Sequence, residues 1–218
     1  MNRLGLSLKL VWSSFVWAAL GVTVLQVAAV AVLQPWHFVE KIELIHIQVL
    51  YEYTLPFIAS LIMCQLFVAE LDKETSGWFM SLPFQSSLFF GTRWLLGTAT
   101  IFILYLVGIA AIHLLVLPIP LRTFSYHVLP PALWLGHLAL LGSLIGRTYI
   151  AGISVSLFYW VMESLTNGAI TDRLYLFSGS LQEGAELIWN RNALLFGSLL
   201  AFILCIFVFG RRTFFVNR

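Results

Sequence analysis

The sequence predicts an all-α, polytopic membrane protein with six transmembrane helices. Of its 218 residues, 60% are hydrophobic and only 10% are charged, whereas soluble domains are about 25% charged. The apolar residues also cluster into runs close to the roughly 20 residues that a helix needs to cross the hydrocarbon core of a bilayer. The net charge of +2, with no basic run beyond Arg211 and Arg212, excludes the class of nucleic-acid-binding proteins.

Six apolar runs are expected to span the bilayer, at residues 11–33, 55–69 (extended by 51–54), 94–117, 129–146, 149–165 and 193–210. Only Arg147 and Thr148 separate the fourth run from the fifth, which predicts a tight hairpin. Gly142 and Gly146 are small residues four positions apart, so another helix is able to approach closely there, either the hairpin partner or a second subunit. Residues 1–218 are expected to form one transmembrane domain, because no soluble stretch is long enough to build its own core.

The segments between the runs are also informative. Residues 34–53 and 167–192 are too apolar for solvated loops and too charged for spans, so we expect interfacial or re-entrant helices that pack on the bundle. At the start of the chain, Arg3 and Lys9 alternate with apolar residues. This pattern predicts either an amphipathic helix in the membrane interface or a ragged beginning of the first span.

The distribution of basic residues predicts that both termini are cytoplasmic. With six spans, one side of the membrane holds eight of them, namely Arg3, Lys9, Lys73, Arg93, Arg147, Arg211, Arg212 and Arg218. The other side holds four, namely Lys41, Arg122, Arg173 and Arg191. Because cytoplasmic loops carry the excess of Lys and Arg, we expect a multi-pass protein of the cell membrane with both ends inside.

The residue sets of known membrane enzymes are missing from the sequence. A phosphate-binding loop needs a Lys preceded by Gly, but the three lysines follow Leu8, Glu40 and Asp72. None of the five histidines precedes a Glu, as a zinc protease helix requires, and the two Asp residues lie outside the spans. We therefore expect a protein that is not an enzyme and that holds no metal or cofactor of its own.

Three ionisable residues within the spans are candidates for a substrate path. Glu163 lies near the outer end of the fifth run, and a charge in that position is by default a functional hypothesis. One expectation is that Glu163 contacts substrate or serves as a proton site. The other is that it pairs with a polar group of the following outer segment. His113 and His137 are expected either to line a polar path together or to be separate packing residues with satisfied hydrogen bonds.

The segment at residues 70–83 is a compact charged stretch between two apolar runs. As a helix, it would place Leu71, Trp78, Phe79 and Leu82 near one face and Glu70, Lys73, Glu74 and Gly77 near another. Pro83 would then end it. The alternative is an ordinary loop at the membrane interface. A short amphipathic helix held between two spans is a suitable contact for a soluble partner.

The order Glu70, Glu74, Gly77 and Leu82-Pro83, followed ten residues later by Arg93 and another span, resembles the coupling segment of type-2 ABC exporter permeases. The resemblance extends along the chain, through the basic amphipathic start, six spans, the hairpin with an Arg between spans four and five, and the outer segment before span six. The chain departs from the family at Ser76 and Trp78, where the family often has Thr and Leu.

The resemblance implies a permease subunit that pairs with a second permease, identical or related, and with cytoplasmic ABC ATPase subunits that bind ATP and Mg. It places the ATPase contact on a coupling helix at Glu70, Asp72, Lys73, Glu74, Gly77 and Trp78, and a connecting helix at Arg3 and Lys9. The cargo would be amphiphilic or hydrophobic (a lipid, peptide antibiotic or drug) and would move by alternating access. The alternatives are a haem-exporter-type permease of cytochrome maturation and a membrane scaffold or immunity protein that transports nothing.

Overall fold

A computed structural model of the chain describes residues 14–33, 40–68, 86–180 and 184–216. Within these residues all regular structure is helical, which confirms the predicted all-α class. The described part of the chain contains six long helices and two 3₁₀ turns: α2 (Ser14–Leu33), α3 (Leu44–Met63), α6 (Ser86–Leu115), α7 (Leu121–Gly146), α8 (Tyr149–Thr166), η1 (Asp172–Leu174), η2 (Ser178–Ser180) and α9 (Ala185–Val216).

Five of these helices are long and apolar enough to cross a membrane, namely α2, α3, α6, α7 and α9. They agree with the first, second, third, fourth and sixth predicted runs. The fifth run forms helix α8 at the expected residues, but α8 is not among the five. The chain is therefore a multi-pass helical protein by its apolar helices, and a membrane span at α8 stays a prediction.

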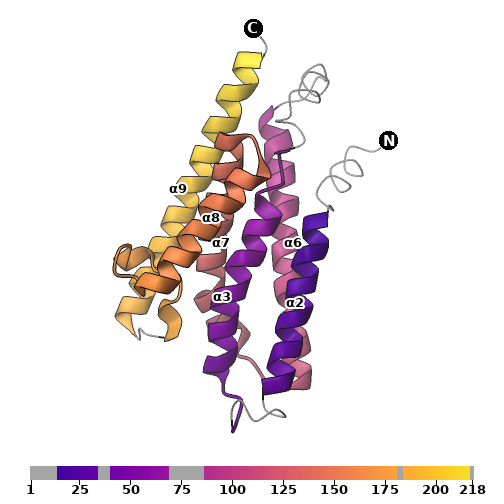
Figure 1. Cartoon of the computed structure of the whole chain (residues 1–218), viewed down its shortest axis with the longest axis vertical. Helices are drawn as coiled ribbons and strands as arrows, with labels where there is room; N and C mark the ends of the chain where they lie inside the picture. The colour runs from indigo at the N-terminus through magenta and orange to yellow at the C-terminus, as the bar shows by residue number, and fades with distance from the viewer. Residues whose placement is uncertain (1–13, 34–39, 69–85, 181–183, 217–218) are drawn as a thin grey trace.

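The long helices run alternately in opposite directions along the bundle (Figure 1). At one end, the Arg147 end, helix α3 ends, α6 begins, α7 joins α8 and α9 ends. At the opposite end, the Asp172 end, α2 ends, α3 begins, α6 joins α7, and the two 3₁₀ turns connect α8 to α9. Helix α7 is central to this arrangement, since it packs against α3, α8 and α9, while α2 lies at the edge against α3 and α6.

The hairpin between α7 and α8 forms as the sequence predicts. Arg147 adopts the left-handed conformation with φ of 58°, and the Thr148 hydroxyl accepts a hydrogen bond from the Ala151 amide to cap α8. A Cβ atom added to Gly142 would lie 3.1 Å from the Cα of Gly152, so the two backbones touch with no side chain between them. The small residues thus pack against the hairpin partner, which was one of the two predicted alternatives.

The predicted boundaries of three helices are wrong, because each helix begins before the apolar run that was assigned to it. Residues 44–53 were assigned to an outer interfacial segment, but they form the first half of α3 and include the buried Glu52. Helix α9 begins at Ala185 instead of residue 193, so that it includes the buried Arg191. Likewise, α6 begins at Ser86 instead of residue 94 and encloses Arg93, whose guanidinium donates to the Leu66 carbonyl at 2.6 Å. Charged residues within membrane helices are costly, and those that occur face the interior of the bundle and pair with one another or with backbone carbonyls.

Candidate functional site

The predicted ATPase contact and connecting helix lie outside the described residues. These are Glu70, Asp72, Lys73, Glu74, Gly77 and Trp78 for the contact, and Arg3 and Lys9 for the connecting helix. Their roles stay predictions. The structure does describe the helices on either side of residues 69–85: α3 ends and α6 begins at the Arg147 end of the bundle (Figure 1).

The structure does not bring His113 and His137 together. His113 is exposed at the Asp172 end of α6, where its Nδ1 accepts a hydrogen bond of 2.9 Å from the Ile119 amide and so fixes the turn before α7. His137 is buried in α7 and belongs to a different set of contacts. A polar path that needs both imidazoles side by side is therefore not formed by these residues.

His137 is a satisfied core residue that connects three helices. The indole of Trp94 on α6 donates to its Nε2 at 2.9 Å, so Nε2 is the acceptor and the proton lies on Nδ1. Nδ1 lies 2.7 Å from the Leu133 carbonyl and 2.8 Å from the Ser198 hydroxyl on α9. Both ring nitrogens have hydrogen-bond partners, which agrees with the alternative of a packing residue.

Glu163 lies near the Asp172 end of α8 and is 1% exposed. One carboxylate oxygen accepts from the Thr171 hydroxyl at 2.5 Å, and the other accepts from the Leu176 amide at 3.4 Å. Both donors belong to the segment that joins α8 to α9. The carboxylate therefore pairs with the outer segment, as one of the two sequence-based alternatives states, and it fixes the path of that segment.

A buried ion pair that the sequence analysis missed lies beside this segment. The Arg191 guanidinium on α9 contacts the Glu52 carboxylate on α3 at 2.5 Å, and both side chains are fully buried. The two residues are 139 positions apart in the sequence, and neither belongs to a recognisable motif. Oppositely charged residues close to apolar runs were the only signal, and both residues were assigned to the outer segments 34–53 and 167–192.

Helix α3 adds a second polar side chain to this pair. The Gln48 amide donates to the Glu52 carboxylate at 3.5 Å and to the Gly179 carbonyl at 3.2 Å, and it lies 3.2 Å from Nδ1 of His127 on α7. Gly179 has no side chain, and a Cβ atom there would overlap the carboxylate of Glu52 and the amide of Gln48. The glycine therefore allows the backbone of η2 to approach the ion pair directly.

Helix α9 holds the same segment from the other side. The Asn190 amide donates to the carbonyls of Arg173 and Tyr175, both at 3.0 Å, and its oxygen accepts from the Ser178 hydroxyl at 2.7 Å. Arg191 also donates to the Leu176 carbonyl at 3.1 Å. Backbone groups of residues 171–180 are thus satisfied by side chains of three helices, as buried polar groups require.

We call this arrangement the polar clasp and define it as Gln48, Glu52, Glu163, Asn190 and Arg191 with the segment 171–180. The segment also packs by its apolar residues, since the ring of Phe177 stacks on Tyr53 with centroids 4.0 Å apart. Burial raises the pKa of the neighbouring Tyr175 phenol to about 12. Among the described residues, no three His, Cys, Asp or Glu side chains come together.

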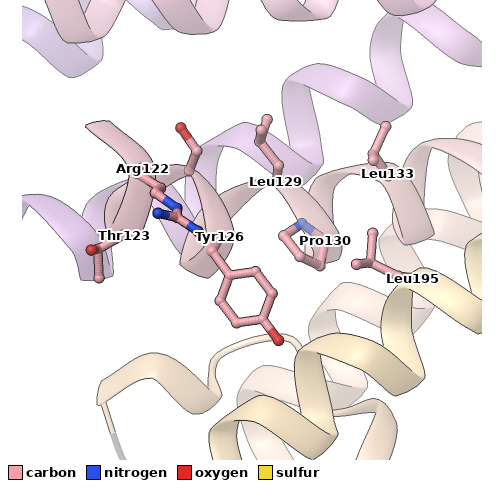
Figure 2. Close-up of a pocket in the computed structure, with 8 residues that line it drawn as sticks. Arg122, Thr123, Tyr126, Leu129, Pro130, Leu133 and Leu195 are labelled. Atoms are coloured by element: carbon pink, nitrogen blue, oxygen red, sulfur yellow. The ribbon is translucent and has the colours of Figure 1, made fainter. Parts of the chain in front are cut away.

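A groove on α7 is the second feature at the Asp172 end (Figure 2). Its volume is about 680 Å³, within the roughly 300–1,000 Å³ of small-molecule sites. It is lined by Arg122, Thr123, Ser125, Tyr126, Leu129, Pro130, Leu133 and, from α9, Leu195. Figure 2 shows Arg122 and Thr123 toward one end of the groove and Leu133 and Leu195 toward the other. The groove therefore changes from polar to apolar along its length.

Comparison of the chain with protein-family models, curated proteins and solved structures found no match.

Proposed function

We propose that this chain is the membrane-embedded permease subunit of an ATP-driven exporter of the type-2 ABC class. It would pair with a second permease and with cytoplasmic ATPase subunits that bind ATP and Mg. The cargo would be an amphiphilic or hydrophobic molecule, and both termini would lie in the cytoplasm. The chain itself would carry out no chemical reaction.

One observation carries the proposal. The charged segment 70–83 follows α3 and precedes α6, and the described ends of both helices lie at the same end of the bundle as the C-terminal end of α9 and the α7–α8 hairpin (Figure 1). In the proposed arrangement, a soluble motor on that side would contact the segment and the end of α9 together. This arrangement is what a coupling element between a motor and a helical bundle needs.

Helix α3 supplies a mechanical route from that segment across the bundle. Its 20 residues extend over about 30 Å. One end of the helix leads into residues 69–85, and the other half carries Gln48 and Glu52 into the polar clasp. A displacement of α3 at the Arg147 end would therefore shift the ion pair at the Asp172 end, because a packed helix moves as a rigid element.

Alternating access would use this route. Nucleotide binding to the ATPases would draw the coupling segments of two permeases together, and the bundle would change from inward-open to outward-open. The free energy comes from the stronger binding of nucleotide to one of the two states. In this scheme the clasp closes the Asp172 end in one state, and the motion of α3 releases it in the other.

Charge reversal in the coupling segment tests the proposal. We expect Glu70→Lys combined with Glu74→Lys, in the full complex with its ATPase in lipid vesicles, to lower cargo-stimulated ATP hydrolysis at least tenfold, because repulsion at the contact would separate motor from bundle. Glu40→Lys is the matched control, since Glu40 is an exposed acid at the Asp172 end and should leave the rate unchanged. The measurement is the rate of phosphate release with and without cargo.

Two results would contradict the proposal. A scaffold protein would show full function in the doubly reversed variant. An intramembrane enzyme would show turnover as a purified single chain, without any ATPase bound.

A further inference from the structure

We propose that the groove on α7 binds one anionic phospholipid, taken from the membrane leaflet at the Asp172 end. Its headgroup would pair with Arg122, and an acyl chain would lie along Leu129, Leu133 and Leu195. This inference does not rest on the proposed function, because a membrane protein of any activity is able to hold a specific lipid.

The charge at the rim favours an anionic headgroup. Arg122 is exposed in the first turn of α7, and no acidic side chain within the described part of the chain lies within salt-bridge distance of it. The exposed Thr123 is adjacent and adds a hydroxyl group. A guanidinium binds phosphate by two parallel hydrogen bonds, so these two residues provide a headgroup site with one cation and one hydroxyl.

The length of the groove matches one leaflet. Arg122 and Leu133 are eleven positions apart on α7, which corresponds to about 16 Å along a helix with a rise of 1.5 Å per residue. Half of the hydrocarbon core of a bilayer is about 15 Å. With the arginine at the membrane surface, the apolar part of the groove would therefore reach the depth of the acyl chains.

The apolar sides of the groove are suited to a flexible acyl chain. Leu129, Pro130 and Leu133 form the side of the groove on α7, and Leu195 of α9 forms the opposite side. Pro130 has no amide hydrogen, and its ring replaces the side chain that would otherwise extend from this position. Among the described residues that line the groove, Arg122 is the only charged one, and the deeper part is lined by apolar side chains.

A lipid fits the groove better than a protein helix. An apolar helix from a second copy of the chain would bury the guanidinium of Arg122 without a partner, and an unpaired buried charge is costly. A lipid with a phosphate headgroup satisfies the cation and the apolar walls at once. The wall is also connected to the polar clasp, because the Tyr126 hydroxyl donates to Asn192 at 3.2 Å and to the Ile188 carbonyl at 3.4 Å, on either side of Asn190 and Arg191.

Lipid titration of the purified full chain tests the headgroup site. In mild detergent, native mass spectrometry would count bound phosphatidylglycerol and phosphatidylcholine with identical acyl chains. We expect phosphatidylglycerol to bind about fivefold more tightly, the effect of one cation near an anionic headgroup. Arg122→Gln should remove this preference, whereas Arg173→Gln, an exposed cation at the same end but outside the groove, should keep it.

A second pair of variants tests the part of the groove that would hold the acyl chain. Leu133→Trp fills the deeper part of the groove and should reduce binding of both lipids at least fivefold. Leu157→Trp, an exposed position on α8, is the matched control and should leave binding unchanged. Circular dichroism of each variant would verify that the helical fold is retained.

Three outcomes would overturn the inference. These are equal affinity of the unaltered chain for the two lipids, equal losses in Arg122→Gln and Arg173→Gln, and equal behaviour of the two Trp variants. A dimer whose cross-links pass through Leu129 and Leu133, with lipid excluded, would assign the groove to a second copy of the chain instead.

Discussion

Helix α8 is held at its two ends by different kinds of contact. At the Arg147 end, Gly152 lies against Gly142 of α7 and meets the Ala139 carbonyl so closely that an added Cβ atom would overlap it. At the Asp172 end, Glu163 binds a hydroxyl and an amide of the following segment, and the Glu52–Arg191 pair lies beside them. The first contact depends on shape alone, whereas the second depends on a complete set of donors, acceptors and charges. A complementary shape tolerates loss of any one atom better than a buried charge tolerates loss of its partner.

The largest expected effect follows from breaking the ion pair. Arg191→Leu would leave the Glu52 carboxylate buried without its cation and would remove the donor to the Leu176 carbonyl. We expect it to lower the free energy of unfolding in detergent by about 3–5 kcal/mol. Denaturant titration followed by circular dichroism measures this change, and Arg173→Leu, at an exposed arginine, should change it by less than about 0.5 kcal/mol.

The double variant Glu52→Leu with Arg191→Leu tests whether the two charged residues stabilise the fold as a pair. Glu52→Leu with Arg191→Leu removes both charges, so it should be more stable than either single variant, because a buried pair replaced by apolar residues is often neutral. Additive losses would mean that the two residues act separately and that the polar clasp is not a unit.

A smaller effect is expected at the hairpin. Gly152→Ala would press a methyl group against the Ala139 carbonyl and against Cys64 and Ser143. Because backbone must shift to admit it, we expect a loss of about 1–3 kcal/mol in the same unfolding titration. Gly21→Ala on α2 has open space around the added methyl group and should change stability by no more than about 1 kcal/mol. Equal results at the two glycines would refute the close contact of α7 with α8.

The smallest effect is expected at Glu163. Glu163→Gln keeps an oxygen to accept from Thr171 but places an NH₂ group where the other oxygen faces the Leu176 amide. The loss of one hydrogen bond should cost about 1 kcal/mol. Hydrogen exchange of the Leu176 amide should also accelerate, while Glu186→Gln, an exposed acid near the start of α9, should leave this exchange rate unchanged. Unaltered exchange in Glu163→Gln would mean that this carboxylate does not hold the segment.

The sequence predicts contacts that are local in the chain. The hairpin at Arg147 and Thr148 was predicted correctly because two residues are too few for any other connection between antiparallel helices. Cys64 and Cys205 each lie within an apolar run of the sequence, and both are buried and form no disulfide. For Glu163, the prediction of a partner in the next segment is consistent with the bonds from Thr171 and Leu176, which lie 8 and 13 positions away.

Contacts between distant parts of the chain were not predicted from the sequence. Glu52 and Arg191 each look like the end of a span when considered alone, and only their mutual contact across 139 positions makes each compatible with a buried helix. The same reason explains the errors at the beginnings of α3 and α9. His113 and His137 were expected either to line a path together or to be separate packing residues, and the fold places them in separate environments.

The two cysteines have a practical consequence for following motion in this protein. Cys64 donates to the Leu61 carbonyl next to the contact with Gly152, and Cys205 lies against the His137 carbonyl, each with no exposed surface. A buried thiol reacts with maleimide only when the reagent is able to reach it. The alkylation rate of each cysteine therefore reports how often its own helix contact opens. Mass spectrometry of peptides would measure the alkylation rate at the two positions. The faster rate would identify the contact between helices that opens more readily, with no engineered label.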